Sequence, residues 1–377
     1  MAGDKLQLQF EGVEHRDVSE GAVHPSSPGM TVFWRQDQPV GHLFRTDAGE
    51  LRDTCLQPPP AVQQQPATKA DASIVICTRD RPDELRRCLQ SLPSQRMQPK
   101  EIIVVDNASQ DSRTREVAEA AGVIYIREDR PGLDFARNAG ARSAAAEIIA
   151  YTDDDVILHP AWLERLVAAF DEPTIGAVTG LVLPAELATE AQRHFEAYWS
   201  FGQGYRRRDF RAADFSAAKD SVFPAWKVGA GASMAFRRAV FDKAGWFDER
   251  LDVGQAGCSG DSEFWYRLQA NGFDCRYEPA SVAFHFHRRT MDGLGSQIFH
   301  YMRGHSAALL VQHERTGIRA NLRQAFAVMP QWYLGRLWKR IRGRREPEDR
   351  FLRQEILGYL SGILFYYRAP RPECHDG

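Results

Sequence analysis

A chain of 377 residues, 43% hydrophobic and 26% charged, has the composition of a folded globular protein. Its net charge of −2 excludes a general electrostatic attraction to nucleic acid, and no nucleic-acid partner is expected. The six cysteines form no CxxC pair, which argues for a reduced intracellular chain without a zinc site. Neither a signal-peptide pattern nor an apolar run of ~20 residues is present, so we expect a cytoplasmic protein.

The first 70 residues are polar and contain one clear structural signal. In "TVFWRQDQPVGHLFR" (31–45), two β-rich segments flank a polar turn, which predicts a β-hairpin. Residues 57–70 are rich in proline and glutamine and predict a linker, because they cannot build a core. We therefore expect an N-terminal β-hairpin extension over 1–56. Its candidate roles are docking and oligomerisation, and the second role would make the protein a homo-oligomer.

From residue 71 to about 290, short β-type runs alternate with helical stretches. Strands buried on both faces show continuous apolar runs, and the helices show apolar residues at helical spacing. Such alternation predicts right-handed βαβ units and a mainly parallel sheet. The predicted strands are 72–78, 100–109, 123–128 and 147–155, and the predicted helices are 81–92, 111–122 and 133–146.

Polar clusters end three of these strands: "TRDR" (78–81), "DNAS" (106–109) and "DDD" (153–155). In open parallel sheets, ligands bind beyond the carboxyl ends of the strands, so a ligand site is expected there. Neither a G-x-G-x-x-G fingerprint nor a P-loop is present, which argues against NAD and Walker-type ATP binding.

The aspartate triplet is the strongest chemical signal. Strand alternation sends Asp153 and Asp155 to one side and Asp154 to the other, where it serves structure. Paired hard oxygen ligands near phosphate suit Mg²⁺ or Mn²⁺. A solvated acidic turn is the alternative, but the apolar residues on both sides favour the end of a core strand.

The motifs of residues 72–290 resemble those of the family 2 glycosyltransferases and occur in the same order. They include "IVICTRDRPDELRRCLQSL", "EIIVVDNASQD", "GLDFARNAG", "AYTDDDVILHPAWL" and "VGAGASMAFRRAVFDKAGWFDERL". The resemblance implies the A-type glycosyltransferase fold, an α/β fold with a mainly parallel mixed sheet flanked by helices. It implies a catalytic domain over 71–290, with a nucleotide-sugar half (71–156) and an acceptor half (157–290).

The resemblance also implies residues that bind the donor. Asp106 would hold the base or ribose, although an N-cap or Asx turn explains the same residue. Arg137 would contact the donor, with a helix-face salt bridge as its alternative. The implied donor-binding residues are Thr78, Arg79, Arg81, Asp106, Asn107, Arg137, Asn138, Asp153 and Asp154.

A metal shell is implied next to the donor. Asp155 would ligate Mn²⁺ or Mg²⁺, and such a cation stabilises the charge on a departing nucleoside diphosphate. In "HFHR" (285–288), His285 and His287 share one face of a predicted strand. The resemblance implies that one of them completes the metal shell, while a structural role is the alternative for each.

The acceptor hydroxyl needs a general base, and "GCSGDSEFWYRL" (257–268) offers two acids just upstream of a helix. The family motif is Glu-Asp followed by a variable residue and an acid, with the aspartate as base. Here Gly260 replaces the glutamate, so the match is partial. The resemblance implies Asp261 as base, with Glu263 as competitor, and helix N-capping is the alternative role.

Three further residues are candidates for binding the acceptor. Gly229 and Gly231 would let an acceptor approach the backbone, or else serve tight packing. Trp199 would stack on a sugar, although core packing explains it better.

Residues 291–377 are expected to form a helical C-terminal region. Within 331–345, aromatic and basic residues combine in one predicted helix. This pattern suits peripheral contact with the inner face of an anionic membrane, as a lipid-linked acceptor would require, while a helical hairpin with a solvated basic face is the alternative.

The expected function is inverting transfer of a single sugar from a UDP-, GDP- or dTDP-linked donor to a hydroxyl acceptor, in polysaccharide or glycolipid biosynthesis. The absence of the Q-x-x-R-W signature argues against a processive synthase. Two competitors are a sugar nucleotidyltransferase and a non-catalytic protein that binds nucleotide-sugars or glycans. The first would need a glycine-rich loop after the first strand, and the second would need neither a metal site nor a base.

Overall fold

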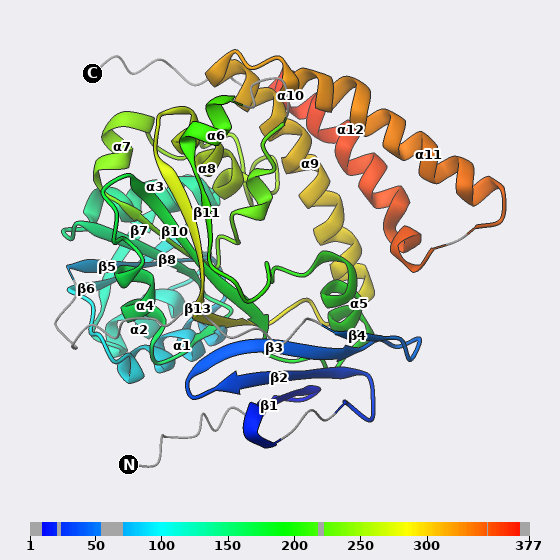
Figure 1. Ribbon diagram of the computed structural model, residues 1–377. Coiled ribbons are helices and arrows are strands. Elements are labelled where there is room, and N and C mark those ends of the chain that lie inside the picture. Colours follow the sequence, from blue (N-terminus) through cyan, green and yellow to red (C-terminus); the bar gives the residue numbers. More distant parts are fainter. Residues whose placement is uncertain (1–9, 21–23, 54–70, 218–221, 345, 370–377) are drawn as a thin grey trace.

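A computed structural model describes residues 10–20, 24–53, 71–217, 222–344 and 346–369 (Figure 1). The predicted linker, 57–70, lies outside these residues. Two sheets are present in the described part: a four-stranded N-terminal sheet and a nine-stranded central sheet. Helices cover both faces of the central sheet, and a helical region follows it in the chain.

The first half of the central sheet has the predicted parallel strands. β5 pairs in parallel with both β6 and β8, and β6 pairs in parallel with β7. All four predicted strands and the three helices between them are confirmed, with ends shifted by a few residues. Their bounds are β5 (Ala72–Thr78), α1 (Pro82–Ser91), β6 (Glu101–Asn107), α2 (Arg113–Ala120), β7 (Ile124–Glu128), α3 (Leu133–Ser143) and β8 (Ile148–Asp153).

The apolar runs form strands because both faces of the sheet are covered. In β5, Ile74 and Ile76 lie in one core cluster with residues of α1, whereas Val75 lies in another with residues of α3. All three side chains are fully buried. A strand in this position has no solvent side, so it needs apolar residues at every position.

The second half of the sheet adds antiparallel strands and brings distant residues to the end of β8. β12 (Ser233–Arg237) pairs antiparallel with β8, and Ser233 lies opposite Thr152. β13 (Asp274–His285) pairs with β9 (Val156–Leu158), so that His285 lies opposite Val156, directly after the aspartate triplet. The other elements are α4 (Trp162–Ala168), β10 (Ile175–Pro184), α5 (Glu190–Trp199), β11 (Arg208–Phe210), α6 (Ala212–Ala217), α7 (Ala239–Ala244) and α8 (Gly260–Ala270).

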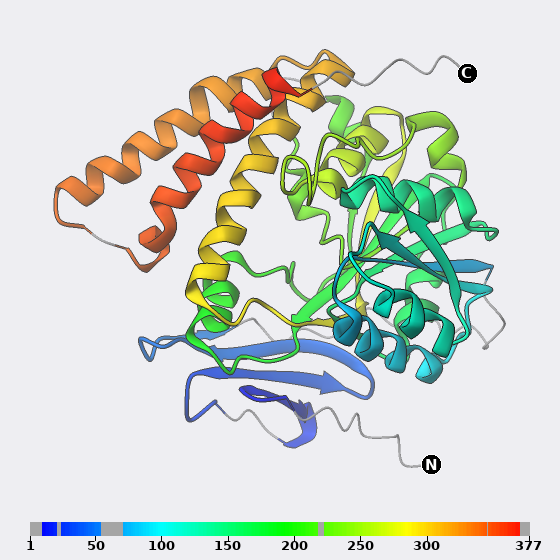
Figure 2. The same cartoon turned by 180° about the vertical axis from the view of Figure 1, so that it is seen from behind.

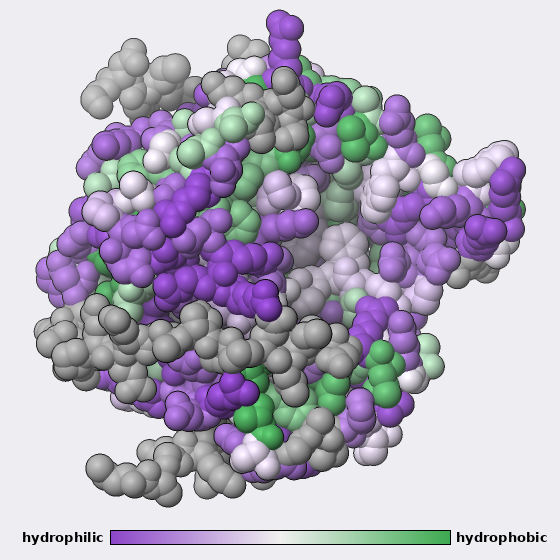
Figure 3. Space-filling model, viewed as in Figure 1, coloured by the Kyte–Doolittle hydropathy of each residue, from purple (hydrophilic) through white to green (hydrophobic). Residues whose placement is uncertain are grey.

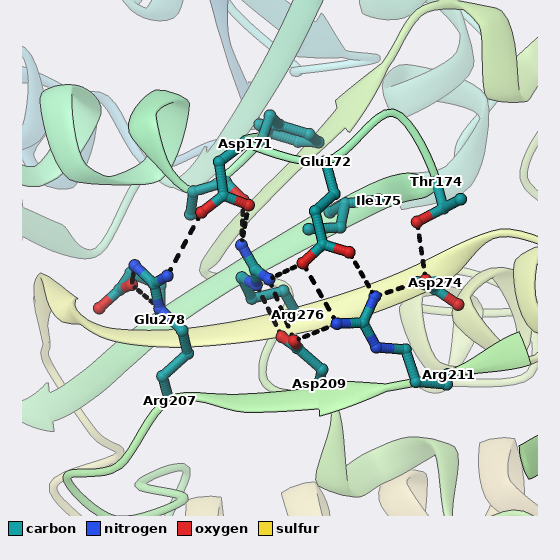
Figure 4. Close-up of polar contacts among 12 residues, drawn as sticks. Asp171, Glu172, Thr174, Ile175, Arg207, Asp209, Arg211, Asp274, Arg276 and Glu278 are labelled. Atoms are coloured by element: carbon teal, nitrogen blue, oxygen red, sulfur yellow. Dashed lines mark hydrogen bonds and ion pairs between the residues drawn. The ribbon is translucent and has the colours of Figure 1, made fainter. Parts of the chain in front are cut away.

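A network of ion pairs joins edge strand β11 to β13 (Figure 4). Arg276 of β13 donates to Asp209 of β11, with an Nε–Oδ1 distance of 2.6 Å, and also to Glu172. Arg211 donates to Glu172 and to Asp274. Because every carboxylate has a guanidinium partner, these side chains hold the edge of the sheet and offer no open ligand site.

The N-terminal sheet contains the predicted hairpin, formed by β2 (Gly29–Arg35) and β3 (Gln38–Arg45). It lies along the lower edge of the molecule in Figures 1 and 2. Trp34 stacks on His159 beyond β9, with ring centroids 5.5 Å apart, and Asp37 in the hairpin turn pairs with Arg165 of α4. The hairpin is therefore joined to the central domain. Its other strands are β1 (Val13–Asp17) and β4 (Leu51–Asp53).

The C-terminal region is helical, as predicted. α9 (Met291–Thr316) runs beside the central domain, and α12 packs along it so closely that a side chain at Gly358 or Gly362 would meet the α9 backbone. α11 and α12 form a hairpin that extends away from the core (Figures 1 and 2). No helix in the described part of the chain is long and apolar enough to cross a bilayer. The remaining helices are α10 (Ala320–Arg323), α11 (Met329–Ile341) and α12 (Leu352–Arg368).

Candidate active site

The aspartate triplet lies where β8 ends and the chain turns into β9, and an arginine and a histidine contact it. Arg81 donates to Asp154 at 2.6 Å and to Asp155 at 2.8 Å. His285 Nε2 lies 3.2 Å from the other oxygen of Asp155. Thr78, at the end of β5, donates to Asp154. Arg81 and His285 thus offset part of the repulsion among the three carboxylates.

The three carboxyl groups have different electrostatic environments. Burial and the neighbouring Asp155 raise the pKa of Asp153 to about 6 and that of Asp154 to about 7. Burial acts in the same direction on Asp155, but His285 and Arg81 outweigh it and lower the pKa of Asp155 below its usual range. Asp155 is therefore the carboxylate that is ionised at all physiological pH values.

Asp153, Asp155 and His285 form a group that could hold a metal ion. Each offers one ligand atom, and these atoms all lie within 4.8 Å of one another. Two carboxylate oxygens and one imidazole nitrogen suit Mn²⁺ or Mg²⁺ that also binds diphosphate. The residues present thus fit the predicted cation.

His287 occupies a different position from the one proposed for a metal ligand. Its Nδ1 lies 3.0 Å from Nδ1 of His285, and its Nε2 lies 3.3 Å from Glu196 of α5. Its two ring nitrogens therefore face His285 and Glu196, and neither faces the aspartate triplet. In the structure, His287 contacts the ring of His285 and Glu196.

A second cluster surrounds Arg137 of α3. Its Nη1 donates to Asp134 at 2.9 Å and to Asp252 at 2.6 Å, and all three residues are buried. The pair with Asp134, three residues away, is the helix-face salt bridge considered as the alternative role. Burial raises the pKa values of Asp153 and Asp261, and the charge of Arg137 opposes this rise at both, so it acts on both clusters.

Asp261 lies in the first turn of α8, beside this cluster. Its Oδ1 accepts a hydrogen bond from the Ser262 amide at 2.6 Å, and its Oδ2 lies 3.0 Å from where a Cβ of Gly231 would be. Burial and Asp252 raise the pKa of Asp261. Ser259, at the N-cap, makes no side-chain capping bond, and Asp261 lies inside the helix and not upstream of it. Asp261 therefore accepts a hydrogen bond from one of the free backbone N–H groups in the first turn of α8, where the helix dipole also favours an acid, and this structural role is compatible with a role as base.

Residues 73–245 match the family model described as Glycosyl transferase family 2. This segment belongs to glycosyl transferase family 2. The mixed, mainly parallel sheet and its helical layers agree with the predicted A-type glycosyltransferase fold, which is confirmed.

Several curated proteins are similar to part of this chain. The O-antigen biosynthesis protein RfbC of Myxococcus xanthus is 28% identical over 53% of this chain and 16% of its own length. The pre-mycofactocin glycosyltransferase of Mycobacterium tuberculosis (strain ATCC 25618 / H37Rv) is 26% identical over 64% of this chain and 48% of its own. The glucosyl-dolichyl phosphate glucuronosyltransferase of Haloferax volcanii is 26% identical over 47% and 55%. The chain spans about half or less of these relatives.

One solved structure covers a larger share of the chain. The mannosyltransferase of Pyrobaculum calidifontis, in complex with GDP-Man and Mn²⁺, is 16% identical and covers 80% of this chain and 89% of its own. Its TM-score is 0.49. The likeness concerns the fold alone.

Glu263 is the competing candidate for the base, and the structure gives it other contacts. It is fully buried, and its two oxygens accept from Arg267 at 2.9 and 2.8 Å. Arg267 in turn donates to the backbone of Ala244 and Trp246. Glu263 therefore anchors α8 to the end of α7 through Arg267, and both of its oxygens are engaged in this ion pair.

Three of the implied donor residues make contacts that serve the fold. Asp106 is fully buried and accepts from the Ser109 amide at 2.9 Å, so the Asx-turn explanation holds, and its other oxygen accepts from Tyr125. Asn107 accepts from the Gly132 amide. Asn138 accepts from the backbone amide of Phe247, in the segment between α7 and α8.

The remaining candidates are Arg79 and the three proposed acceptor-binding residues, and they lie in different parts of the fold. The Arg79 side chain is exposed. Its Nε lies 3.7 Å from a carboxylate oxygen of the neighbouring Asp80. A side chain at Gly229 would collide with Thr179, so this glycine serves packing. Trp199 packs beside Tyr301 between α5 and α9, as the core explanation predicts. Gly231 is the acceptor candidate that lies against Asp261.

Asp134, Asp252 and Glu196 belong to these clusters, but sequence reasoning missed them. Asp252 could have been found from the density of acids between 248 and 263. Asp134 gives no such signal, since its importance comes from its contact with Gly260. A Cβ at Gly260 would collide with the Asp134 carboxylate, whose Oδ2 is buried without a hydrogen-bond partner. Asp134 thus fills the space next to the position where the family motif has glutamate.

This contact gives a prediction. Gly260→Ala should lower the free energy of unfolding by about 1–3 kcal/mol, because the added methyl overpacks a buried site. In a background that already carries Asp134→Gly, the Gly260→Ala change should cost much less. Urea denaturation of the wild type, both single variants and the double variant gives this double-mutant cycle. Equal costs of Gly260→Ala with and without Asp134 would show that the collision is relieved elsewhere. Gly335→Ala is the matched control, because nothing lies within 4 Å of a Cβ at this helical glycine.

Proposed function

We propose that this protein is an inverting glycosyltransferase that moves one sugar from a nucleoside-diphosphate sugar to a hydroxyl acceptor, assisted by Mn²⁺ or Mg²⁺. One observation supports this function above all. The buried Arg137 interacts electrostatically both with Asp153 of the Asp153–Asp155–His285 group and with the base candidate Asp261. A leaving diphosphate and an attacking hydroxyl need such a pair of sites around one sugar.

The donor side is built to hold a diphosphate. A divalent cation at Asp153, Asp155 and His285 would supply stabilisation of the charge that develops on the leaving phosphate oxygen. Arg81 holds Asp154 and Asp155 in place, and His287 holds the ring of His285. Preorganisation of these ligands means that little reorganisation is needed when the donor binds.

The acceptor side is built around Asp261. Its carboxylate would take the proton of the acceptor hydroxyl while the acceptor oxygen bonds to the anomeric carbon, and the bond from that carbon to the diphosphate oxygen breaks. With Asp261 as a base and not a nucleophile, the sugar is attacked once, from the face opposite to the diphosphate. The configuration at the anomeric carbon is therefore inverted. Gly231 would leave room for the acceptor next to Asp261.

The relatives suggest the classes of acceptor. One is named as an O-antigen biosynthesis protein and another as a glucosyl-dolichyl phosphate glucuronosyltransferase. We therefore propose a glycan or a lipid-linked sugar as acceptor for this chain. A sugar nucleotidyltransferase fits less well, because the β5–α1 turn uses Thr78 and Arg81 to bind Asp154 and has no glycine-rich triphosphate loop.

A donor panel tests this function. Purified protein should release nucleoside diphosphate from one of a set of UDP-, GDP- and dTDP-sugars in the presence of Mn²⁺, and the release should stop with EDTA. An acceptor mixture of glycans and polyprenyl-phosphate sugars should raise the rate of release. Release of pyrophosphate from a nucleoside triphosphate and a sugar phosphate would instead show a nucleotidyltransferase. No turnover of any donor, with tight binding of one, would show a binding protein.

A further inference from the structure

In the hairpin of α11 and α12, some apolar side chains are buried in helix contacts and others are exposed. Between the two helices, Tyr333 lies against Tyr359, with ring centroids 5.6 Å apart, and Arg336 donates to Glu355. Met329 and Tyr333 are the buried residues of α11. These contacts hold the hairpin together, and α12 also packs along α9, but each helix keeps one face that neither contact covers.

A second apolar stripe runs along α11. Leu334, Leu337, Trp338 and Ile341 recur at positions i, i+3, i+4 and i+7, which is the spacing of one helix face. Their exposed fractions are 66%, 38%, 55% and 78%. The stripe is about a quarter of a turn away from Tyr333, so packing on α12 does not require it. A helix with this pattern normally buries such a face.

α12 carries a similar stripe. Leu357, Leu360, Leu364 and Tyr367 are all exposed, at 47%, 55%, 48% and 67%. They lie about half a turn from Gly358 and Gly362, which face α9, and therefore on the outer side of the hairpin. We call the two stripes together the hairpin apolar face. Figure 3 shows the molecule from one side, with the hairpin projecting beyond the hollow at its centre.

The charge of α11 and of the residues on either side of it is strongly positive. From Arg315 to Arg345 the sequence contains nine lysines and arginines and no acidic residue, although the whole chain has a net charge of −2. Lys339, Arg340 and Arg342 are exposed in the last turns of α11, next to the apolar stripe. The guanidinium of Arg342 lies 4.5 Å from the ring centroid of Trp338. Cations therefore border the apolar residues.

We propose that the hairpin apolar face binds the surface of an anionic lipid bilayer. Leucine, isoleucine and tryptophan side chains would enter the boundary between headgroups and acyl chains, and the bordering cations would meet anionic headgroups. A second copy of this chain is a poorer occupant, because it would bring the exposed cations Lys339, Arg340 and Arg342 of two chains together. This surface goes beyond the proposed sugar transfer and would hold the active site near a lipid-linked acceptor.

Vesicle flotation tests the proposal with the full chain. The protein should float with vesicles of phosphatidylcholine and phosphatidylglycerol and much less with vesicles of phosphatidylcholine alone, and added salt should release it. The variant L334Q/W338Q/I341Q should lower the partition coefficient about tenfold or more, since three side chains lose their insertion into the boundary. The control variant L51Q/I124Q replaces exposed apolar residues on β4 and β7 and should float like the wild type.

A charge variant separates the two contributions. K339Q/R340Q/R342Q should lower binding to anionic vesicles about tenfold and leave the weak binding to phosphatidylcholine unchanged. R86Q/R113Q/R115Q, with cations on α1 and α2, is its control and should bind normally. Wild-type melting temperatures and Mn²⁺ responses in all variants show that the fold and the donor site are intact. Wild-type protein that stays at the bottom of the gradient, or forms a dimer that L334Q/W338Q/I341Q dissociates, would overturn the proposal.

Discussion

The variant Asp261→Asn is expected to lower kcat by about 10²- to 10⁴-fold, the usual contribution of a general base, with little change in donor binding. Asparagine keeps the shape of the side chain and its contact with Ser262, but it cannot accept the acceptor proton. Release of nucleoside diphosphate with saturating donor and Mn²⁺ measures kcat, and a Mn²⁺-dependent thermal shift with donor measures binding. Full turnover by this variant would rule out Asp261 as the base.

The pH profile gives a second readout of the same residue. Burial and Asp252 raise the pKa of Asp261, and a base works only when it is deprotonated, so kcat should fall as the pH drops through this raised pKa. Asp261→Asn should remove that acidic limb from its residual rate. Asp292→Asn is the matched control, since Asp292 is an exposed acid in the first turn of α9 and should leave both kcat and the profile unchanged.

Asp155→Ala is expected to abolish the response to metal and to reduce turnover by about 10²-fold or more. Without Asp155, the site keeps one carboxylate and one imidazole, and Arg81 and His285 lose a shared partner. In the wild type, Mn²⁺ at a hundred times its Kd should stabilise the fold by about 2.7 kcal/mol, because it binds only the folded state. Differential scanning fluorimetry with and without Mn²⁺ measures the metal response, and release of nucleoside diphosphate measures turnover. Asp129→Ala, an exposed acid that pairs with Arg127, is the control.

The metal response should depend on pH with a definite sign. The pKa values of Asp153 and Asp154 are about 6 and about 7, above those of an unfolded chain. These two groups therefore stabilise the metal-free fold at low pH, and this contribution is lost as the pH rises through 6 and 7. Mn²⁺ competes with the protons, so its stabilising effect should be larger at pH 8 than at pH 5.5. An equal shift at both values would show that Asp153 is not a ligand.

The alternation of strands and helices between residues 72 and 155 was predictable because its causes are local. A strand covered on both faces needs a continuous apolar run, and a βαβ unit joins neighbouring strands with one hand. The position of the triplet at the end of β8 follows from the same pattern. β1 and β4 were not predicted, since β1 is polar and gains its order by pairing with β2.

The roles of individual acids were less predictable, since they depend on contacts between distant segments. Asp261 and Glu263 are two residues apart and look alike in the sequence. In the fold, Glu263 faces Arg267, one turn further along α8, while Asp261 faces Gly231. In the same way, β13 brings His285 to Asp155, and His287 turns toward Glu196 of α5.

By itself, the sequence determined the parallel core of the sheet, the position of the acid triplet at its carboxyl edge and the helical C-terminal region. These features depend on apolar periodicity and on residues close together in the chain. Only the tertiary structure decided which carboxylates face cations, which one lies beside Gly231, and which apolar faces of α11 and α12 stay exposed. The reason is physical: burial, ion pairing and exposure are set by neighbours from β12, β13 and α9, which lie far from the triplet in sequence.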